Sequence, residues 1–180
     1  MEKHKHVVIV YPHPDDESFG AAGIIQHFRK QGVRVTYLCG TLGEMGRNMG
    51  NPPFANRETL KDIRKKELED ACKFLDIDYR LLGYRDKTIE FENKEKVAND
   101  LKEVFEELEP TLVVTHYPGH GVHPDHNALG EAAIEAVRLM DKEKRPTVWA
   151  AAITQDFERV LGEPDIVFEL DDEQFEFKLN

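Results

Sequence analysis

The stretch Val7-Val8-Ile9-Val10-Tyr11-Pro12-His13-Pro14-Asp15-Asp16-Glu17 joins an apolar run to a histidine and three carboxylates. The apolar run predicts a buried strand, so the polar residues are expected at the end of that strand. Ligands of open α/β sheets bind outside the carboxyl ends of the strands. A second segment of the same kind, His123-Pro124-Asp125-His126, follows the β-branched run 111–115. We therefore expect the two segments to form one site.

Predicted strands alternate with predicted helices along most of the chain. Strands are expected at residues 7–11, 33–39, 79–82, 111–115 and 147–153, with an edge strand at 166–170, and helices at 20–30, 57–75, 94–108 and 124–140. Residues 40–56 contain four glycines and two adjacent prolines, which predicts a long loop, either a functional lid or disordered. The alternation predicts an α/β fold with a Rossmann-like, mostly parallel sheet, helices on both of its faces, and a single domain spanning residues 1–180.

The composition limits the classes of partner. A count of 35 Asp and Glu against 24 Lys and Arg gives a formal net charge of -11, which argues against nucleic acid as a partner. The apolar run near the N-terminus is too short for a secretory signal or a membrane span, so a cytoplasmic protein without membrane partners is expected. Cys39 and Cys72 are expected to be reduced core residues, and His4 and His6 to belong to a mobile terminus.

The spacing of the two polar segments is typical of a metal site. A mononuclear hydrolytic zinc site needs three protein ligands and one open position for water, and two histidines with one carboxylate supply that set. His13 and Asp16 are three residues apart, and His123 and His126 are three apart across the predicted start of a helix, where such pairs face the same way. The alternative is that His-Pro-Asp is a common turn sequence and each histidine only caps a helix.

Taken together, the two segments resemble the paired motif of the LmbE/PIG-L-like family of zinc-dependent deacetylases of N-acetylglucosamine derivatives. Residues 41–55 and 83–91 resemble more closely the bacillithiol biosynthesis deacetylases within that family. The resemblance runs from Val7 to about Val167. Members of the family normally continue past the position of Asn180, so the resemblance implies that a C-terminal family segment is missing here.

The resemblance also implies a role for each residue of the two segments. His13, Asp16 and His126 would bind zinc, Asp15 would be the general base, and His123 would stabilise the oxyanion or protonate the leaving amine. The chemistry agrees, because zinc lowers the pKa of bound water to about 7, and a carboxylate and an imidazole can then move protons. The same ligands also suit Fe²⁺ or Co²⁺, since ligand type limits the choice of metal without selecting it.

Further residues are expected to orient groups or to contact the substrate. Asp125 is expected either to orient His123 in catalysis or to be a structural acid of the first helical turn. Four residues are expected to bind the substrate: Glu44, Arg47, Arg64 and Asp86. Arginine suits bidentate recognition of carboxylates, so an anionic amino sugar is expected, and the resemblance implies N-acetylglucosaminyl malate.

Other functions are compatible with the same residues. One is an amidase that acts on a thiol-sugar conjugate at the same site. Another is a non-haem iron oxygenase, which also uses two histidines and a carboxylate but gives no reason for Asp15 beside Asp16. The third is a metal-binding module without catalysis. The expected partner is a small amino-sugar substrate, and homo-oligomerisation is left open.

Overall fold

Five parallel strands form one sheet in the computed structural model, which describes residues 3–47 and 49–179. The strands are β1 (His6–Tyr11), β2 (Arg34–Cys39), β3 (Asp78–Leu81), β4 (Leu112–His116) and β5 (Thr147–Ala151), in the order β3-β2-β1-β4-β5. All four pairings are parallel, with Val7 opposite both Val35 and Leu112. The expected Rossmann-like sheet is therefore confirmed. Asn48, within the loop stretch quoted above, lies outside the described residues.

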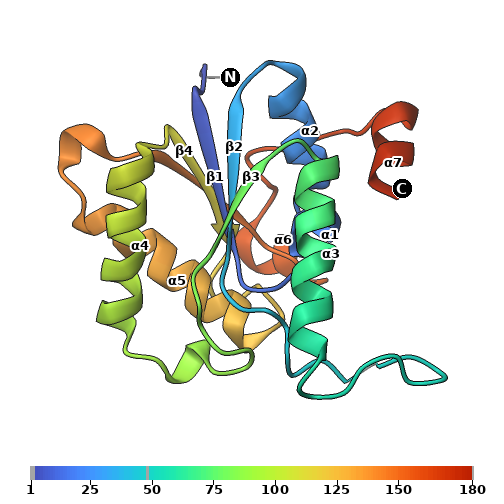
Figure 1. Ribbon diagram of the computed structural model, residues 1–180. Coiled ribbons are helices and arrows are strands. Elements are labelled where there is room, and N and C mark those ends of the chain that lie inside the picture. The colour runs from blue at the N-terminus through green and yellow to red at the C-terminus, as the bar shows by residue number, and fades with distance from the viewer. Residues whose placement is uncertain (1–2, 48, 180) are drawn as a thin grey trace.

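Helices cover both faces of the sheet (Figure 1). They are α1 (Asp16–Phe19), α2 (Ala22–Lys30), α3 (Leu60–Phe74), α4 (Lys94–Leu108), α5 (Pro124–Leu139), α6 (Phe157–Leu161) and α7 (Asp172–Leu179), with 3₁₀ turns at Ile89–Phe91 and Lys142–Lys144. Val7 and Ile9 pack in one core with α2 and α3, whereas Val8 and Val10 pack in the other with α4 and α5. Burial on both faces explains why residues 7–10 of the first strand are all apolar.

The loops that carry the polar segments all leave the sheet at a single edge. Because the strands are parallel, the segments after β1, β2, β3 and β4 all leave their carboxyl ends, at the lower edge of the sheet in Figure 1. Helix α5 lies close against β4 at this edge, since a Cβ on Gly130 would stand 2.3 Å from the His116 carbonyl oxygen. The glycine thus brings the start of α5 to the ends of the central strands.

The long loop and the two thiols are as expected. No helix or strand occurs within 40–56 in its described part. Cys39 and Cys72 are free and buried. None of the described helices has the length and apolarity required to cross a bilayer.

The expected edge strand at 166–170 is wrong, because this segment has no regular structure. Its side chains pack on α2 and β5: Phe168 contacts the rings of His27 and Trp149, and Leu170 lies against Gly23. Tertiary packing therefore overrides the β propensity of the run. The expected helix 20–30 is α2, which begins two residues later, at Ala22, while the short helix α1 before it was not expected. Helix α7 was not expected, although Asp171 and Gln174 form reciprocal side chain to backbone hydrogen bonds, the signature of a capping box.

The expectation of a mobile terminus is wrong for His4 and His6, which are both buried. The His4 ring contacts Phe28 and Trp149 edge to face. His6 Nδ1 donates to the Leu108 carbonyl oxygen at 2.9 Å, so its Nε2 accepts from the Thr36 hydroxyl at 2.9 Å. His6 therefore ties β1 to the end of α4 and to β2.

The burial of His6 predicts a loss of stability in acid. Burial lowers the pKa of His6 in the folded protein, whereas the unfolded chain takes up this proton near the ordinary pKa of about 6.5. Below that pH the unfolded chain binds more protons, so the free energy of unfolding falls by up to about 1.4 kcal/mol per pH unit from this group.

Denaturant unfolding of wild type and His6→Gln at pH about 7.5 and about 5.5 measures this contribution. The variant should be less stable at the higher pH, because a hydrogen-bonded ring is lost, but should lose less stability on acidification. An equal loss in both proteins would show that His6 does not contribute to the acid sensitivity.

Candidate metal centre

Three donor side chains converge at the carboxyl edge of the sheet. His13 follows β1, Asp16 begins α1, and His126 lies in the first turn of α5. His13 Nδ1 lies 3.2 Å from His126 Nε2, and the Asp16 oxygens lie 3.4 Å from His126 Nε2 and 3.6 Å from His13 Nδ1. Donors held about 2.0–2.1 Å from a tetrahedral ion would lie about 3.3 Å from one another. The spacing therefore fits one metal ion with a fourth position for a further ligand.

A hydrogen bond orients the His126 imidazole toward this cluster, and two nearby carboxylates orient that of His13. His126 Nδ1 donates to the Gly121 carbonyl oxygen at 2.7 Å, which leaves the lone pair of Nε2 for a metal. His13 Nε2 lies 3.3 Å from Asp86 Oδ1 and 3.4 Å from Asp125 Oδ2, so its proton faces these carboxylates and Nδ1 is left for the metal. Such outer partners are a regular feature of metal-binding histidines, because they select the tautomer and the ring orientation.

The electrostatic field of the cluster favours a cation. Burial by itself lowers the pKa of His13, but Asp125, Asp16 and Asp86 together raise it to about 11. Burial also opposes ionisation of Asp16, yet the neighbouring histidines hold the pKa of this carboxyl below its ordinary value. A site that stabilises an imidazolium in this way also attracts a divalent ion, with which the proton would compete.

Asp125 supports His13 instead of orienting His123. Its carboxylate is fully buried and accepts hydrogen bonds from the backbone N–H groups of Lys87 at 2.7 Å and Ile89 at 3.1 Å. Only its backbone N–H meets His123, donating to Nδ1 at 3.1 Å. The expected orientation of His123 by the Asp125 side chain is therefore corrected. His13, His123 and Asp125 also form a potential ligand group, but these existing hydrogen bonds make it less suited to a metal.

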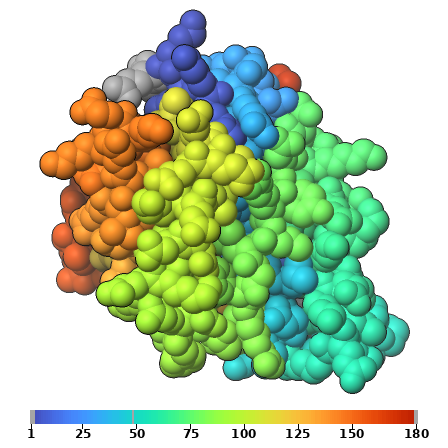
Figure 2. Space-filling view, turned by 60° about the vertical axis from the view of Figure 1, so that its left-hand side comes forward, coloured from blue at the N-terminus to red at the C-terminus, as the bar shows by residue number. Residues whose placement is uncertain are grey.

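Asp86 and Glu44 join two loops beneath His13. Asp86 is only 3% exposed and accepts from the Met45 backbone N–H at 2.8 Å, while Glu44 Oε1 accepts from the Asp86 N–H at 3.1 Å. In Figure 2 the light blue segment that follows β2 lies between α3 and the green chain that follows β3. Asp86 thus lies behind the cluster and not at a surface open to substrate. Glu44 Oε2 is buried without a hydrogen-bond partner among the described residues.

Asp15 and His123 are the two other expected catalytic residues near the donor residues. Asp15 directly precedes Asp16, and its carboxylate is half exposed. The His123 ring meets the His13 ring edge to face, with centroids 4.8 Å apart. Because His123 Nδ1 accepts a hydrogen bond from the Asp125 backbone, the proton of the neutral ring is on Nε2. Asp15 therefore offers a proton acceptor, and His123 offers a hydrogen-bond donor.

The two arginines expected to bind substrate differ in their surroundings. Arg64 donates from Nη2 to Asp15 Oδ2 at 2.7 Å and also to the Pro14 carbonyl oxygen. Its guanidinium is thus paired with the carboxylate of Asp15 inside the site, and the expected contact of Arg64 with substrate stays a prediction. Arg47 is exposed in the loop between β2 and α3.

Several supporting residues were not identified as such from the sequence. The ring of His116 stacks on His126 with centroids 4.0 Å apart and on Tyr11 at the same distance. Burial lowers the pKa of His116 to about 3, so the ring is a neutral platform for His126. Tyr37 donates from its hydroxyl to the His13 carbonyl oxygen at 2.7 Å. These residues lie within apolar strands, where no local pattern distinguishes them from core residues.

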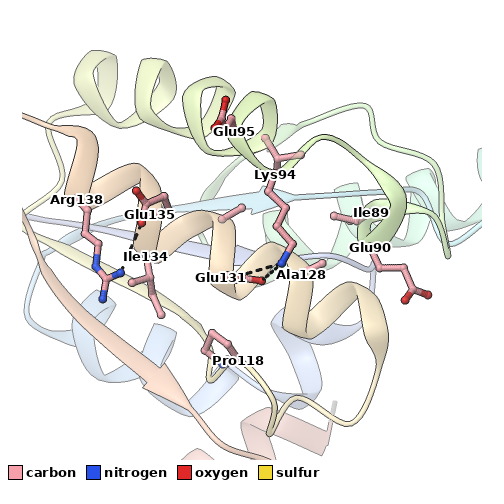
Figure 3. A pocket seen from close by; sticks show the side chains of 12 residues that line it. Ile89, Glu90, Lys94, Glu95, Pro118, Ala128, Glu131, Ile134, Glu135 and Arg138 are labelled. Carbon is pink, nitrogen blue, oxygen red and sulfur yellow. Dashed lines mark hydrogen bonds and ion pairs between the residues drawn. The ribbon is translucent and has the colours of Figure 1, made fainter.

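A hollow of about 420 Å³ between α4 and α5 is a separate feature (Figure 3). Ion pairs between Lys94 and Glu131 and between Arg138 and Glu135 lie on its walls. None of the candidate ligands lines it. The chemistry therefore belongs to the edge of the sheet and not to this hollow.

Comparisons with known proteins identify relatives of this chain. The model of the family described as GlcNAc-PI de-N-acetylase (PIG-L) matches residues 8–137. The chain is 54% identical over 176 residues to the probable N-acetyl-alpha-D-glucosaminyl L-malate deacetylase 2 of Bacillus cereus, covering 97% of this chain and 80% of that protein. It is 56% identical over 167 residues to the protein of the same name in Bacillus subtilis, covering 92% and 76%.

A solved structure of a related protein has the same fold. The N,N'-diacetylchitobiose deacetylase of Pyrococcus horikoshii is 31% identical, with a TM-score of 0.68. The match covers 79% of this chain and 53% of that one, so it extends over about half of the other protein.

The ligand assignment predicts a loss of metal affinity. Replacing His13, Asp16 or His126 by Ala removes one of three donors. The affinity for zinc should therefore fall by more than the roughly 10–100-fold that is typical when a residue hydrogen-bonded to a ligand is replaced. Equilibrium dialysis with metal analysis measures the affinity. His120→Ala is a matched control, because His120 Nδ1 contacts the Thr154 hydroxyl at 2.8 Å outside the cluster. Retention of wild-type affinity in any of the three variants would remove that residue from the ligand set.

Proposed function

Because the chain belongs to the GlcNAc-PI de-N-acetylase (PIG-L) family, we propose that it is a metal-dependent hydrolase that removes the acetyl group from N-acetylglucosaminyl malate, as in bacillithiol biosynthesis. One observation carries the proposal: the donors of His13, Asp16 and His126 converge closely enough to bind one metal ion, and Asp15, whose carboxylate is half exposed, directly precedes Asp16. A metal with an open position next to a carboxylate base is what amide hydrolysis requires. The two Bacillus relatives support this substrate by their names.

In this proposal His13, Asp16 and His126 hold the metal, and the metal is zinc. Two imidazoles and one carboxylate suit zinc, and they also suit Fe²⁺ or Co²⁺. Bound there, zinc would polarise the amide carbonyl and lower the pKa of a water to about 7. Asp86 and Asp125 orient His13 for this task, because both carboxylates face its second nitrogen.

Asp15 serves as the general base. Its carboxylate adjoins a metal ligand in sequence and is half exposed, so it can take the proton of a water entering the site. His123 stabilises the oxyanion on the other side of the cluster, because its Nε2–H can donate a hydrogen bond to the amide oxygen while Nδ1 accepts from the Asp125 backbone N–H. The departing nitrogen then receives the proton that Asp15 has taken from water.

Arg47 and Glu44 are proposed to contact the substrate. Arg47 is an exposed cation on the loop beside the site and could pair with the malate carboxylates. Glu44 lies on the same loop and is proposed as the second contact, since its carboxylate oxygen Oε2 has no hydrogen-bond partner among the described residues. Cytoplasmic location remains an expectation from the sequence.

Acetate release tests the function directly. The zinc-loaded protein should release acetate from N-acetylglucosaminyl malate and should act more slowly on free N-acetylglucosamine, which lacks the malate carboxylates. A chelator should abolish the reaction and added zinc should restore it. A thiol-sugar conjugate assayed in parallel tests for an amidase. Absence of acetate from every substrate with the fully metallated protein would contradict the proposal.

Replacing the base should separate chemistry from metal binding. Asp15→Asn keeps the three donors, so metal content should match wild type, while turnover should fall about a hundredfold or more. Asp70→Asn, an exposed acid of α3 paired with Lys66, should keep wild-type turnover. Near wild-type turnover in fully metallated Asp15→Asn protein would exclude Asp15 as the base.

A further inference from the structure

Asp15 has a backbone conformation that side chains rarely adopt. Its φ is 107° and its ψ is -29°, on the left-handed side that favours glycine. Non-glycine residues keep such a conformation only where their surroundings hold them in it, and they cluster at active sites. The contacts that hold Asp15 therefore bear on the position of its carboxylate.

Residues of α1 hold the backbone of Asp15 from one side. The Asp15 N–H donates to Glu17 Oε2 at 2.9 Å, and Glu17 is only 2% exposed. The Asp15 carbonyl oxygen accepts from the N–H groups of Ser18 at 3.0 Å and Phe19 at 2.8 Å. These bonds fix the peptide groups on both sides of Asp15, but none of them involves its carboxylate or the oxygen atom of the Pro14 carbonyl.

Arg64 of α3 holds the remaining groups. The same nitrogen, Nη2, donates to Asp15 Oδ2 at 2.7 Å and to the carbonyl oxygen of Pro14. Glu67 Oε2 lies 3.8 Å from Nε, and the Arg64 side chain is only 21% exposed. A single guanidinium nitrogen therefore joins the Asp15 carboxylate to the turn that carries it.

Gly43 makes room for this arginine. A Cβ at Gly43 would stand 3.0 Å from Arg64 Nη1 and 3.4 Å from its Cδ and Cζ, and the φ of Gly43 is +62°. The long loop after β2 thus passes directly against the guanidinium. This loop and α3, which are both distant from Asp15 in sequence, meet at the turn that holds Asp15.

We propose that Arg64 is a positioning residue that holds the Asp15 carboxylate and its strained turn beside the metal cluster. It acts through Asp15 and does not serve as the receptor for a substrate anion. The inference rests on the proposed function only in taking Asp15 as the base. Two measurements test it, one of which needs no substrate.

Hydrogen exchange monitors the turn without reference to activity. In Arg64→Ala, the N–H groups of Ser18 and Phe19 should exchange several-fold faster, because the turn whose carbonyl they bond is released. Arg64→Lys keeps the charge but not the planar fork and should lie between wild type and the alanine variant. Arg57→Ala is the matched control, since Arg57 donates to the Gly46 carbonyl oxygen at 2.9 Å and should leave these amides unchanged. Wild-type exchange in Arg64→Ala would overturn the proposal.

Kinetics of the metallated proteins distinguish positioning from substrate binding. Arg64→Ala should retain metal and lower kcat by the same factor on N-acetylglucosaminyl malate and on a neutral N-acetylglucosaminide, with KM unchanged. Gly43→Ala should act in the same direction by displacing the guanidinium. In an Asp15→Asn background, Arg64→Ala should cause no further loss, since residues that act as a unit are not additive.

The opposite kinetic results would overturn the proposal: a rise in KM for the malate substrate alone, or losses that multiply in the double variant. If wild type hydrolyses neither substrate, the proposed function fails, and the exchange of Ser18 and Phe19 still decides the role of Arg64.

Discussion

The imidazole of His13 lies between carboxylates on two sides, and each of its nitrogens faces a different side. Nδ1 faces Asp16 and the donor nitrogen of His126, while Nε2 faces Asp86 and Asp125. Burying carboxylates is costly unless each finds partners. The two deeper carboxylates also accept backbone N–H groups from neighbouring loops, so the polar groups that orient His13 also order those loops.

This arrangement depends on the sheet. Parallel pairing of β1 with both β2 and β4 brings the segments that follow these strands to one edge. These segments carry His13, Glu44 and His126. The absence of a side chain at Gly130 lets α5 approach β4 closely, and His116 at the end of β4 then stacks on His126. Packing of a helix on a strand thus determines the distance between two side chains that lie 113 residues apart in sequence.

The site also contains local strain that the fold tolerates. Asp15 has a conformation that costs about 1–3 kcal/mol in most settings. Contacts from α1 and α3 hold it there, so the strain is offset by hydrogen bonds and an ion pair around the same turn. Proteins accept such costs at sites where a reactive group has to point in one direction.

The sequence by itself determined the parallel α/β sheet, the long loop after β2 and the pairing of the two polar segments, because apolar periodicity and short motifs are local properties of the chain. The segment 166–170 and the residues His4 and His6 were predicted incorrectly, since packing against α2, Trp149 and neighbouring strands decides their structure. The roles proposed for the site residues remain predictions. Only the tertiary structure decided that Asp125 faces His13 and that Arg64 pairs with Asp15, because both contacts join distant segments whose proximity is set by how the helices pack on the sheet.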